Sequence, residues 1–154
     1  MLKVGDPLPP FELAQDAGPV VSAANLSAGT VVLYFYPKDD TPGCTVQACA
    51  FRDLGAEFAA AGARIIGVSA DSVESHAAFR AKFNLDFPLL ADTDAALCKA
   101  VGVWGPQSFQ GHEFIGIART TFVIHDGRVA EVYPNVSVHE HAERMLERVK
   151  GLNS

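Results

Sequence analysis

The sequence predicts an α/β fold in which a mixed central sheet is flanked by helices on both faces. Short runs of β-branched and aromatic residues alternate with longer amphipathic stretches, a pattern typical of parallel strands joined by helical crossovers. Two further short runs, separated by Asp-Gly, follow near the C-terminal end and indicate a hairpin, which makes such a sheet mixed. The chain has 154 residues, so we expect a single domain over residues 1–154.

The chain begins with an irregular segment, residues 1–29. A cluster of prolines excludes a helix there, and residues 11–13 and 20–22 could form short edge strands. The first buried strand is predicted over residues 30–36, TVVLYFY. A continuous β-branched and aromatic run of this length is typical of a strand that is covered on both faces.

A turn-rich loop, PKDDTPG at residues 37–43, leads into a helix that we expect over about residues 44–61, because its apolar residues recur with helical spacing. The remaining elements continue the alternation, with Asp or Ser as helix caps. Strands are expected at residues 63–70, 87–91, 120–125 and 128–133, helices ending at about residues 83, 101 and 150, and a loop over residues 102–116. This order is that of a thioredoxin-like fold.

The composition excludes several classes of protein. The 12 basic and 18 acidic residues give a net charge of −6 without a basic cluster, so binding to nucleic acid is not expected. No apolar run approaches the roughly 20 residues that span a bilayer, and the first residues lack the apolar segment of a secretory signal. The three cysteines, Cys44, Cys49 and Cys98, are too few for a disulfide scaffold and suggest reduced thiols in the cytoplasm.

Cys44 is placed where the loop gives way to the expected helix. The free N–H groups of a first helical turn and the positive end of the helix dipole favour an anion there, and the thiolate is the nucleophilic form of cysteine. Thr41 could aim its hydroxyl at the same point, and Pro37 could shield the site from water. From position alone, Cys44 is as readily a small buried hydrophobic residue, as most free cysteines are.

The stretch YPKDDTPGCT, residues 36–45, resembles the active-site loop of peroxiredoxins, P-x-x-x-T/S-x-x-C. The longer string TPGCTVQACAFRD is similar to the bacterioferritin comigratory protein, or peroxiredoxin Q, subfamily. The resemblance covers nearly the whole chain, including FPLLAD at residues 87–92 and RTTFVI at residues 119–124. It implies a thiol-specific peroxidase that reduces hydrogen peroxide and organic hydroperoxides through a cysteine sulfenic acid, without a metal or an organic cofactor.

The same resemblance implies the roles of individual residues. Cys44 would be the cysteine that attacks the peroxide, Thr41 would hydrogen-bond the peroxide, and Pro37 would shelter the site. Arg119 would hold the thiolate and the charge that develops on the peroxide; from position alone it is an ordinary surface arginine. Gln47 departs from the pattern, since many relatives carry glutamate there, and this puts in doubt any role given to that carboxylate.

A sulfenic acid must be resolved before it is oxidised further, and Cys49 is the first candidate. Five residues of intact helix rise about 7.5 Å, whereas the Cα atoms of a disulfide lie about 4.4–6.8 Å apart. Cys44 and Cys49 can therefore bond only if the first helical turns unwind. By resemblance, thioredoxin would then reduce the Cys44–Cys49 disulfide. The alternatives are that Cys49 only packs the helix and an external thiol takes its place, or that Cys98, which we expect to be packed, resolves the sulfenic acid.

Other signals are weaker. The Cys-x4-Cys spacing does not fit zinc, and no phosphate-binding glycine motif is present, so neither a metal nor a nucleotide cofactor is expected. His139 and His141 are expected to be solvated at an exposed helix start. Trp104 and Phe109 either cover the site or anchor their loop. Two rival functions remain open, a thiol–disulfide oxidoreductase and a redox sensor, and a monomer is suggested by resemblance alone.

Overall fold

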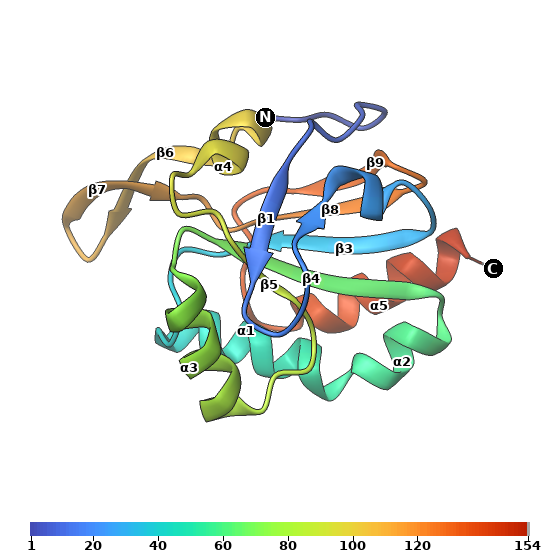
Figure 1. Cartoon of the computed structure of the whole chain (residues 1–154), viewed down its shortest axis with the longest axis horizontal. Coiled ribbons are helices and arrows are strands. Elements are labelled where there is room, and N and C mark those ends of the chain that lie inside the picture. Colours follow the sequence, from blue (N-terminus) through green and yellow to red (C-terminus); the bar gives the residue numbers. More distant parts are fainter. Residues whose placement is uncertain (154) are drawn as a thin grey trace.

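A seven-stranded mixed sheet forms the centre of the computed structural model, which describes residues 1–153 (Figure 1). The sheet consists of β1 (Glu12–Gln15), β2 (Val21–Ser22), β3 (Thr30–Phe35), β4 (Ala63–Ser69), β5 (Leu89–Ala91), β8 (Thr120–His125) and β9 (Arg128–Tyr133). The strand order is β2-β1-β5-β4-β3-β8-β9. β3, β4 and β5 run parallel, while β8 pairs antiparallel with β3, which confirms the predicted mixed sheet. Ser154, the last residue of the expected domain, lies outside the described residues.

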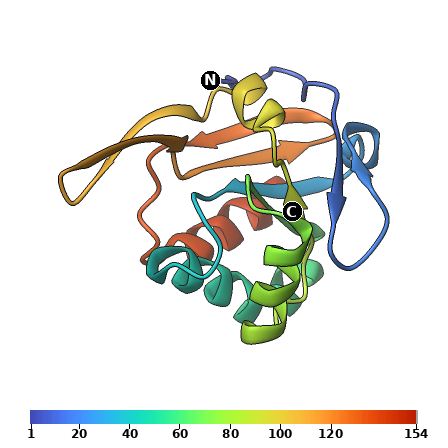
Figure 2. The ribbon, with the colours of Figure 1, turned by 60° about the vertical axis from the view of Figure 1, so that its left-hand side comes forward.

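Helices cover both faces of the sheet. They are α1 (Pro42–Asp53), α2 (Gly55–Ala60), α3 (Val73–Phe83), α4 (Ala96–Val101) and α5 (His141–Leu152), together with the short 3-10 helix η1 (Ala23–Leu26). Figures 1 and 2 show α1, α2, α3 and α5 on one face, and α4 with the N-terminal segment on the other. Within residues 1–153, no helix is long and apolar enough to cross a membrane.

The fully buried strand β3 divides the core into two clusters. Val32 and Tyr34 point toward α1 and α5, whereas Val31, Leu33 and Phe35 point toward α4. This alternation follows from the period of two along a strand, and it explains why residues 30–36 read as one continuous apolar run. Both core clusters pack against β3 and hold it in place. The loop that carries Pro37 and Thr41 follows β3, so the start of this loop is fixed as well.

The helix expected over about residues 44–61 is divided into two helices, α1 and α2, in the structure. The structure starts α1 at Pro42, a favourable residue for the first helical position, and interrupts the helix at Leu54. The interruption comes directly before Gly55, and glycine has a low helix propensity.

The expected loop over residues 102–116 is wrong. It contains an antiparallel hairpin of β6 (Trp104–Phe109) and β7 (His112–Ile117), which extends away from the body of the protein (Figure 1). Gln110 and Gly111 form its two-residue turn, and both have a positive φ, as such tight hairpin turns require. Glycine and proline within the strands, and Gln-Gly in place of Asn-Gly or Asp-Gly, concealed the hairpin in the sequence. The hairpin of β8 and β9, with its Asp-Gly turn, agrees with the prediction.

Candidate active site

Cys44 lies in the first turn of α1, three residues after its N-cap, Thr41. The backbone of Thr41 is extended, and its carbonyl oxygen accepts the first helical hydrogen bond from the Thr45 amide at 2.8 Å. The Cys44 side chain is 1% exposed and packs in the core cluster below β3. The structure therefore places the Cys44 thiol in a first helical turn, where backbone N–H groups lack helical partners, as the sequence predicts.

Arg119, the residue directly before β8, contacts this thiol. Its Nη2 donates to Cys44 Sγ at 3.4 Å, and its Nη1 donates to Gln47 Oε1 at 2.7 Å. The guanidinium fork therefore spans two positions that lie one helical turn apart on α1. Because a guanidinium can only donate, the Gln47 oxygen must face Arg119, and the buried Gln47 Nε2 has no hydrogen-bond partner among the described residues. Cys44 thus has a cation beside it whose orientation is set by a second contact.

Thr41 and Pro37 approach the same point from the loop before α1. The Thr41 hydroxyl donates to the Lys38 carbonyl oxygen at 2.8 Å. Its proton is thereby occupied, and the lone pairs of Oγ1 are left to accept a hydrogen bond from another molecule.

A cavity of about 630 Å³ opens beside these residues. Pro37, Thr41 and Arg119 line one side of it, and the β6–β7 hairpin lines the other, with Trp104 and Phe109 among its wall residues. Cys44 is not among the wall residues, but its neighbour in the chain, Gly43, and its contact partner, Arg119, both are. The structure therefore brings together Cys44, Thr41, Pro37 and Arg119, and it places an apolar wall opposite them.

Gly43 offers a test of how closely the guanidinium must be placed. A Cβ at this position would lie 3.1 Å from Arg119 Nη2, so Gly43→Ala must displace the guanidinium by a few tenths of an ångström. On the expectation from the sequence resemblance that Cys44 reacts with peroxide, its oxidation in stopped-flow kinetics should be slower, by less than the about 100-fold that a misplacement of about 1 Å can cause.

The matched control for this change is Gly55→Ala. It also places a methyl group in a first helical turn, but the new Cβ meets the Asp86 carboxylate at an ordinary contact distance of 3.6 Å. Its oxidation rate should equal that of the unmodified protein. If Gly43→Ala also retains the full rate, the position of the Arg119 guanidinium does not limit the reaction.

The three cysteines occupy different environments, and none of them is in a disulfide. Cys49 is partly exposed in the same helix as Cys44, and that helix is continuous between the two thiols. Cys98 is fully buried in α4, in the core cluster on the opposite side of the sheet. Burial, followed by the neighbouring Asp92 carboxylate, strongly raises the pKa of the Cys98 thiol. Cys98 would have to cross the sheet to reach Cys44.

The expectation that His141 is solvated is wrong. The first turn of α5 packs onto the sheet, so His141 is 5% exposed, with its Nε2 2.9 Å from Thr121 Oγ1. Its ring meets Phe51 of α1 edge to face. Burial, followed by the charges of Arg144 and Arg119, lowers the pKa of His141 to about 4.

Two polar residues next to the site, Asp39 and His76, were missed in the sequence. They form a buried ion pair, with His76 Nδ1 2.7 Å from Asp39 Oδ2. A signal for them is present: Asp39 follows β3, Asp71 follows the parallel neighbour β4, and the carboxyl ends of such strands gather polar site residues. His76 also shares a helical face with Phe79, which predicts that it is buried.

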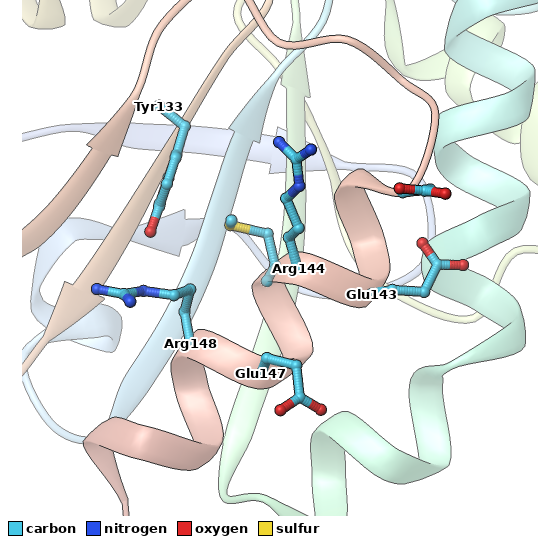
Figure 3. A pocket seen from close by; sticks show the side chains of 7 residues that line it. Tyr133, Glu143, Arg144, Glu147 and Arg148 are labelled. Atoms are coloured by element: carbon cyan, nitrogen blue, oxygen red, sulfur yellow. The ribbon is translucent and has the colours of Figure 1, made fainter.

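A second cavity, of about 590 Å³, lies between β9 and the outer face of α5 (Figure 3). Its walls are Tyr133, Glu140, Glu143, Arg144, Met145, Glu147 and Arg148. The Tyr133 hydroxyl and Arg148 Nε both donate to Glu131, so these polar groups bind one another. None of the predicted site residues lines this cavity, and among residues 1–153 no group of three or more metal-ligating side chains is present.

Comparison with known proteins places this arrangement among characterised relatives. Residues 4–132 match the AhpC/TSA family. Peroxiredoxin Bcp of Bacillus subtilis is 42% identical over 153 residues, which cover 99% of this chain and 98% of the relative. A crystal structure of a PrxQ mutant from Xylella fastidiosa superposes with a TM-score of 0.91 at 35% identity, covering 100% of this chain and 99% of the other. Bacterioferritin comigratory protein of Xanthomonas campestris, studied for its alkyl peroxide reduction activity, superposes with a TM-score of 0.87 at 39% identity, covering 94% and 92%.

Proposed function

The chain belongs to the AhpC/TSA family and is a thiol-dependent peroxidase of the peroxiredoxin Bcp type, and from this premise we propose that Cys44 is the residue that attacks the peroxide. The observation that carries the assignment is the contact between Arg119 Nη2 and Cys44 Sγ, 3.4 Å long, in the first turn of α1. We further propose that residues 1–154 act as one thioredoxin-like domain.

In the first step, the Cys44 thiolate attacks one oxygen of the hydroperoxide. A sulfur–oxygen bond forms, the O–O bond breaks, and the leaving alkoxide or hydroxide takes up a proton to become an alcohol or water. The sulfur is oxidised to a sulfenic acid and the peroxide is reduced. The Arg119 guanidinium stabilises both the thiolate and the charge on the leaving oxygen, because it is fixed before the reaction begins. Thr41 Oγ1 accepts the hydrogen bond of the peroxide O–H, and Pro37 keeps water from the sulfur.

In the second step, the Cys49 thiolate attacks the Cys44 sulfenic sulfur, a disulfide forms, and hydroxide leaves as water. Because α1 is continuous through both cysteines, at least the turns that contain Cys44 must unwind first. Phe51 and Arg52 remain as anchors of the distal part of α1. Phe51 stacks on Tyr34 with a ring separation of 4.8 Å, and Arg52 Nη1 donates to the Phe83 carbonyl oxygen at 2.6 Å. An external dithiol, for which thioredoxin is our proposal, then reduces the disulfide, which is exposed by the unwinding.

Replacement of Cys49 separates the two steps. In Cys49→Ser, one equivalent of peroxide should still convert Cys44 to the sulfenic acid at the unmodified rate, because Cys49 does not contact Arg119 or the cavity. Turnover with thioredoxin should then fall to the low level at which a thioredoxin thiol attacks the Cys44 sulfenic acid directly. A sulfenic-acid-specific probe with mass spectrometry measures the first effect, and coupled thioredoxin reductase turnover measures the second.

Cys98→Ser is the control, since Cys98 lies on the other side of the sheet. It should form a Cys44–Cys49 disulfide and turn over normally. If Cys98→Ser shows the recycling defect and Cys49→Ser does not, Cys98 resolves the sulfenic acid.

The proposed substrates are hydrogen peroxide and organic hydroperoxides, and the apolar wall opposite Arg119 suits the organic part of the latter. We propose that the protein works as a monomer in the cytoplasm, where its thiols stay reduced between turnovers. The decisive assay is catalytic: peroxide should be consumed over many turnovers with a dithiol donor. A redox sensor would react only once, and a thiol–disulfide oxidoreductase would reduce insulin disulfides instead.

A further inference from the structure

The loop between β3 and α1, residues 37–41, is held from behind by the buried Asp39–His76 pair. His76 belongs to α3, which lies beside this loop (Figure 1). His76 is fully buried and Asp39 is 7% exposed. Neither residue lines the cavity or contacts Cys44, so the chemistry described above makes no direct use of them.

The Asp39 side chain binds three neighbours from two parts of the fold, the end of β3 and helix α3. Tyr36, which directly follows β3, donates its hydroxyl to Oδ1 at 2.6 Å. Ser75 of α3 donates its hydroxyl to Oδ2 at 2.8 Å, and His76 Nδ1 lies 2.7 Å from the same oxygen. The backbone N–H of Asp39 donates to Asp71 Oδ2 at 2.8 Å, so the residue is held through its main chain as well.

The partners of His76 determine its protonation. Nε2 lies 3.0 Å from the Leu90 carbonyl oxygen, which can only accept, so Nε2 carries a proton. Nδ1 lies 2.7 Å from Asp39 Oδ2, which also accepts the Ser75 hydroxyl, while Oδ1 accepts the Tyr36 hydroxyl. A proton on Nδ1 supplies the donor for this short contact. With both ring nitrogens protonated, His76 is an imidazolium.

The electrostatic surroundings agree with this charge. Burial opposes the charged imidazole, but the Asp39 hydrogen bond and charge, the Leu90 carbonyl and the Asp71 charge together outweigh it and raise the pKa of His76. Asp39, Tyr36 and the Leu90 carbonyl contact the ring, Ser75 binds the same Asp39 oxygen, and Asp71 acts through its charge. Since the folded pKa exceeds the ordinary value, the ion pair stabilises the fold fully below about pH 6.5, and this contribution is lost as the pH rises through the His76 pKa.

Asp39 is linked to the site through Lys38, its neighbour in the chain. Lys38 precedes Asp39, and the Lys38 carbonyl oxygen accepts the hydroxyl proton of Thr41. Displacement of Asp39 would move this carbonyl, reorient the Thr41 hydroxyl, and shift Pro37 at the start of the same loop.

We propose that His76, as an imidazolium, is a positioning residue of the peroxidase reaction that holds Asp39 and thereby the loop that presents Thr41 and Pro37 to the peroxide. This inference rests on the proposed function, because the loop matters only if the peroxide is reduced beside it. It adds to that function a residue of α3, which is distant from Cys44 in the sequence and does not contact it.

The first test is the proton count on the His76 ring in the unmodified protein. Nitrogen-15 NMR at neutral pH should show protons on both Nδ1 and Nε2, with the nitrogen shifts of an imidazolium. A single ring proton would overturn the proposal. This measurement needs no variant, so it does not depend on whether a substituted protein folds.

The second test compares two neutral amides at position 76. The amide nitrogen of His76→Asn takes about the place of Nδ1 and can still donate to Asp39. The amide nitrogen of His76→Gln takes about the place of Nε2 and donates to the Leu90 carbonyl instead. We expect His76→Gln to slow the oxidation of Cys44 by about tenfold or more, within the about 100-fold range of misplaced groups, and His76→Asn to recover much of this loss. Equal rates in the two variants would overturn the proposal.

The control pair is His125→Asn and His125→Gln. His125 contacts Thr30 through Nδ1 at 2.9 Å, far from the loop in the fold, so neither change should alter the oxidation rate. The outcomes also separate this inference from the proposed function. If Cys44→Ser retains peroxidase turnover, the proposed function fails whatever the charge of His76. If Cys44→Ser is inactive but His76 carries one proton, only the positioning role fails.

Discussion

Cys44→Ser should abolish the peroxidase activity. A serine hydroxyl is not ionised at neutral pH and contains no sulfur that could become a sulfenic acid, so the attack on the peroxide and the proposed disulfide are both lost. Removal of a catalytic nucleophile lowers turnover by about 10⁶-fold in a well-studied hydrolase, and a loss of this size leaves only the background of the dithiol donor. Peroxide consumption coupled to thioredoxin reductase measures it.

The folded state of Cys44→Ser should survive. The site is 1% exposed, so a hydroxyl replaces the sulfur in a buried position, but Arg119 Nη2 remains available as its hydrogen-bond donor. The loss of stability should therefore stay within the about 1–3 kcal/mol that mutational data give for buried hydroxyls. Thermal unfolding measures this loss beside the activity. Turnover that persists in a folded Cys44→Ser protein would move the nucleophile to another residue.

Arg119→Ala should produce the second largest effect. The change removes the donor to Cys44 Sγ and the cation that faces the leaving oxygen, while Gln47 loses the partner of its oxygen. Loss of one fixed donor to a developing oxyanion slows catalysis by about 10²–10³-fold in a comparable case. We expect a reduction in this range in the rate constant for oxidation of Cys44, measured by stopped-flow fluorescence or by competition with a second peroxidase.

Arg119→Lys distinguishes charge from geometry. A lysine keeps the positive charge, but a single ammonium group cannot reproduce the planar fork that spans Gln47 and Cys44. Its rate should lie between those of Arg119→Ala and the unmodified protein. Arg128→Ala is the control, since Arg128 belongs to the neighbouring hairpin strand and donates to the Gly5 carbonyl instead. A full rate in Arg119→Ala would show that the guanidinium takes no part in the chemistry.

The sequence predicts the parts of this protein that depend on local patterns. The continuous run at residues 30–36 predicts a strand covered on both faces, and β3 is fully buried. The Asp-Gly turn predicts the hairpin of β8 and β9 at the observed residues, because few other turns have so strong a local signal. The helix start at Cys44 is predicted to within two residues, since Pro42 and Gly43 mark the turn.

The parts that the sequence does not predict depend on contacts between distant residues. The β6–β7 hairpin has glycine and proline inside its strands, so only the pairing itself distinguishes it from a loop. The Asp39–His76 contact joins positions 37 residues apart in the chain. His141 is buried because α5 docks on the sheet, although its own neighbourhood in the sequence is polar. Among the site residues, Arg119 required the resemblance to a family, because nothing in its immediate sequence distinguishes it from a surface arginine.

For the proposed Cys44–Cys49 disulfide, the interruption of the helix at Leu54 limits how much of the protein would have to rearrange in each catalytic cycle. The segment that carries both Cys44 and Cys49 ends there, and α2 begins as a separate helix that packs against β4 on its own contacts. Melting that starts at Pro42 therefore involves at most one short helix. In the proposed cycle, α2 keeps its own packing against β4 while the turns of α1 unwind, so the rearrangement is confined to the helix that carries both thiols.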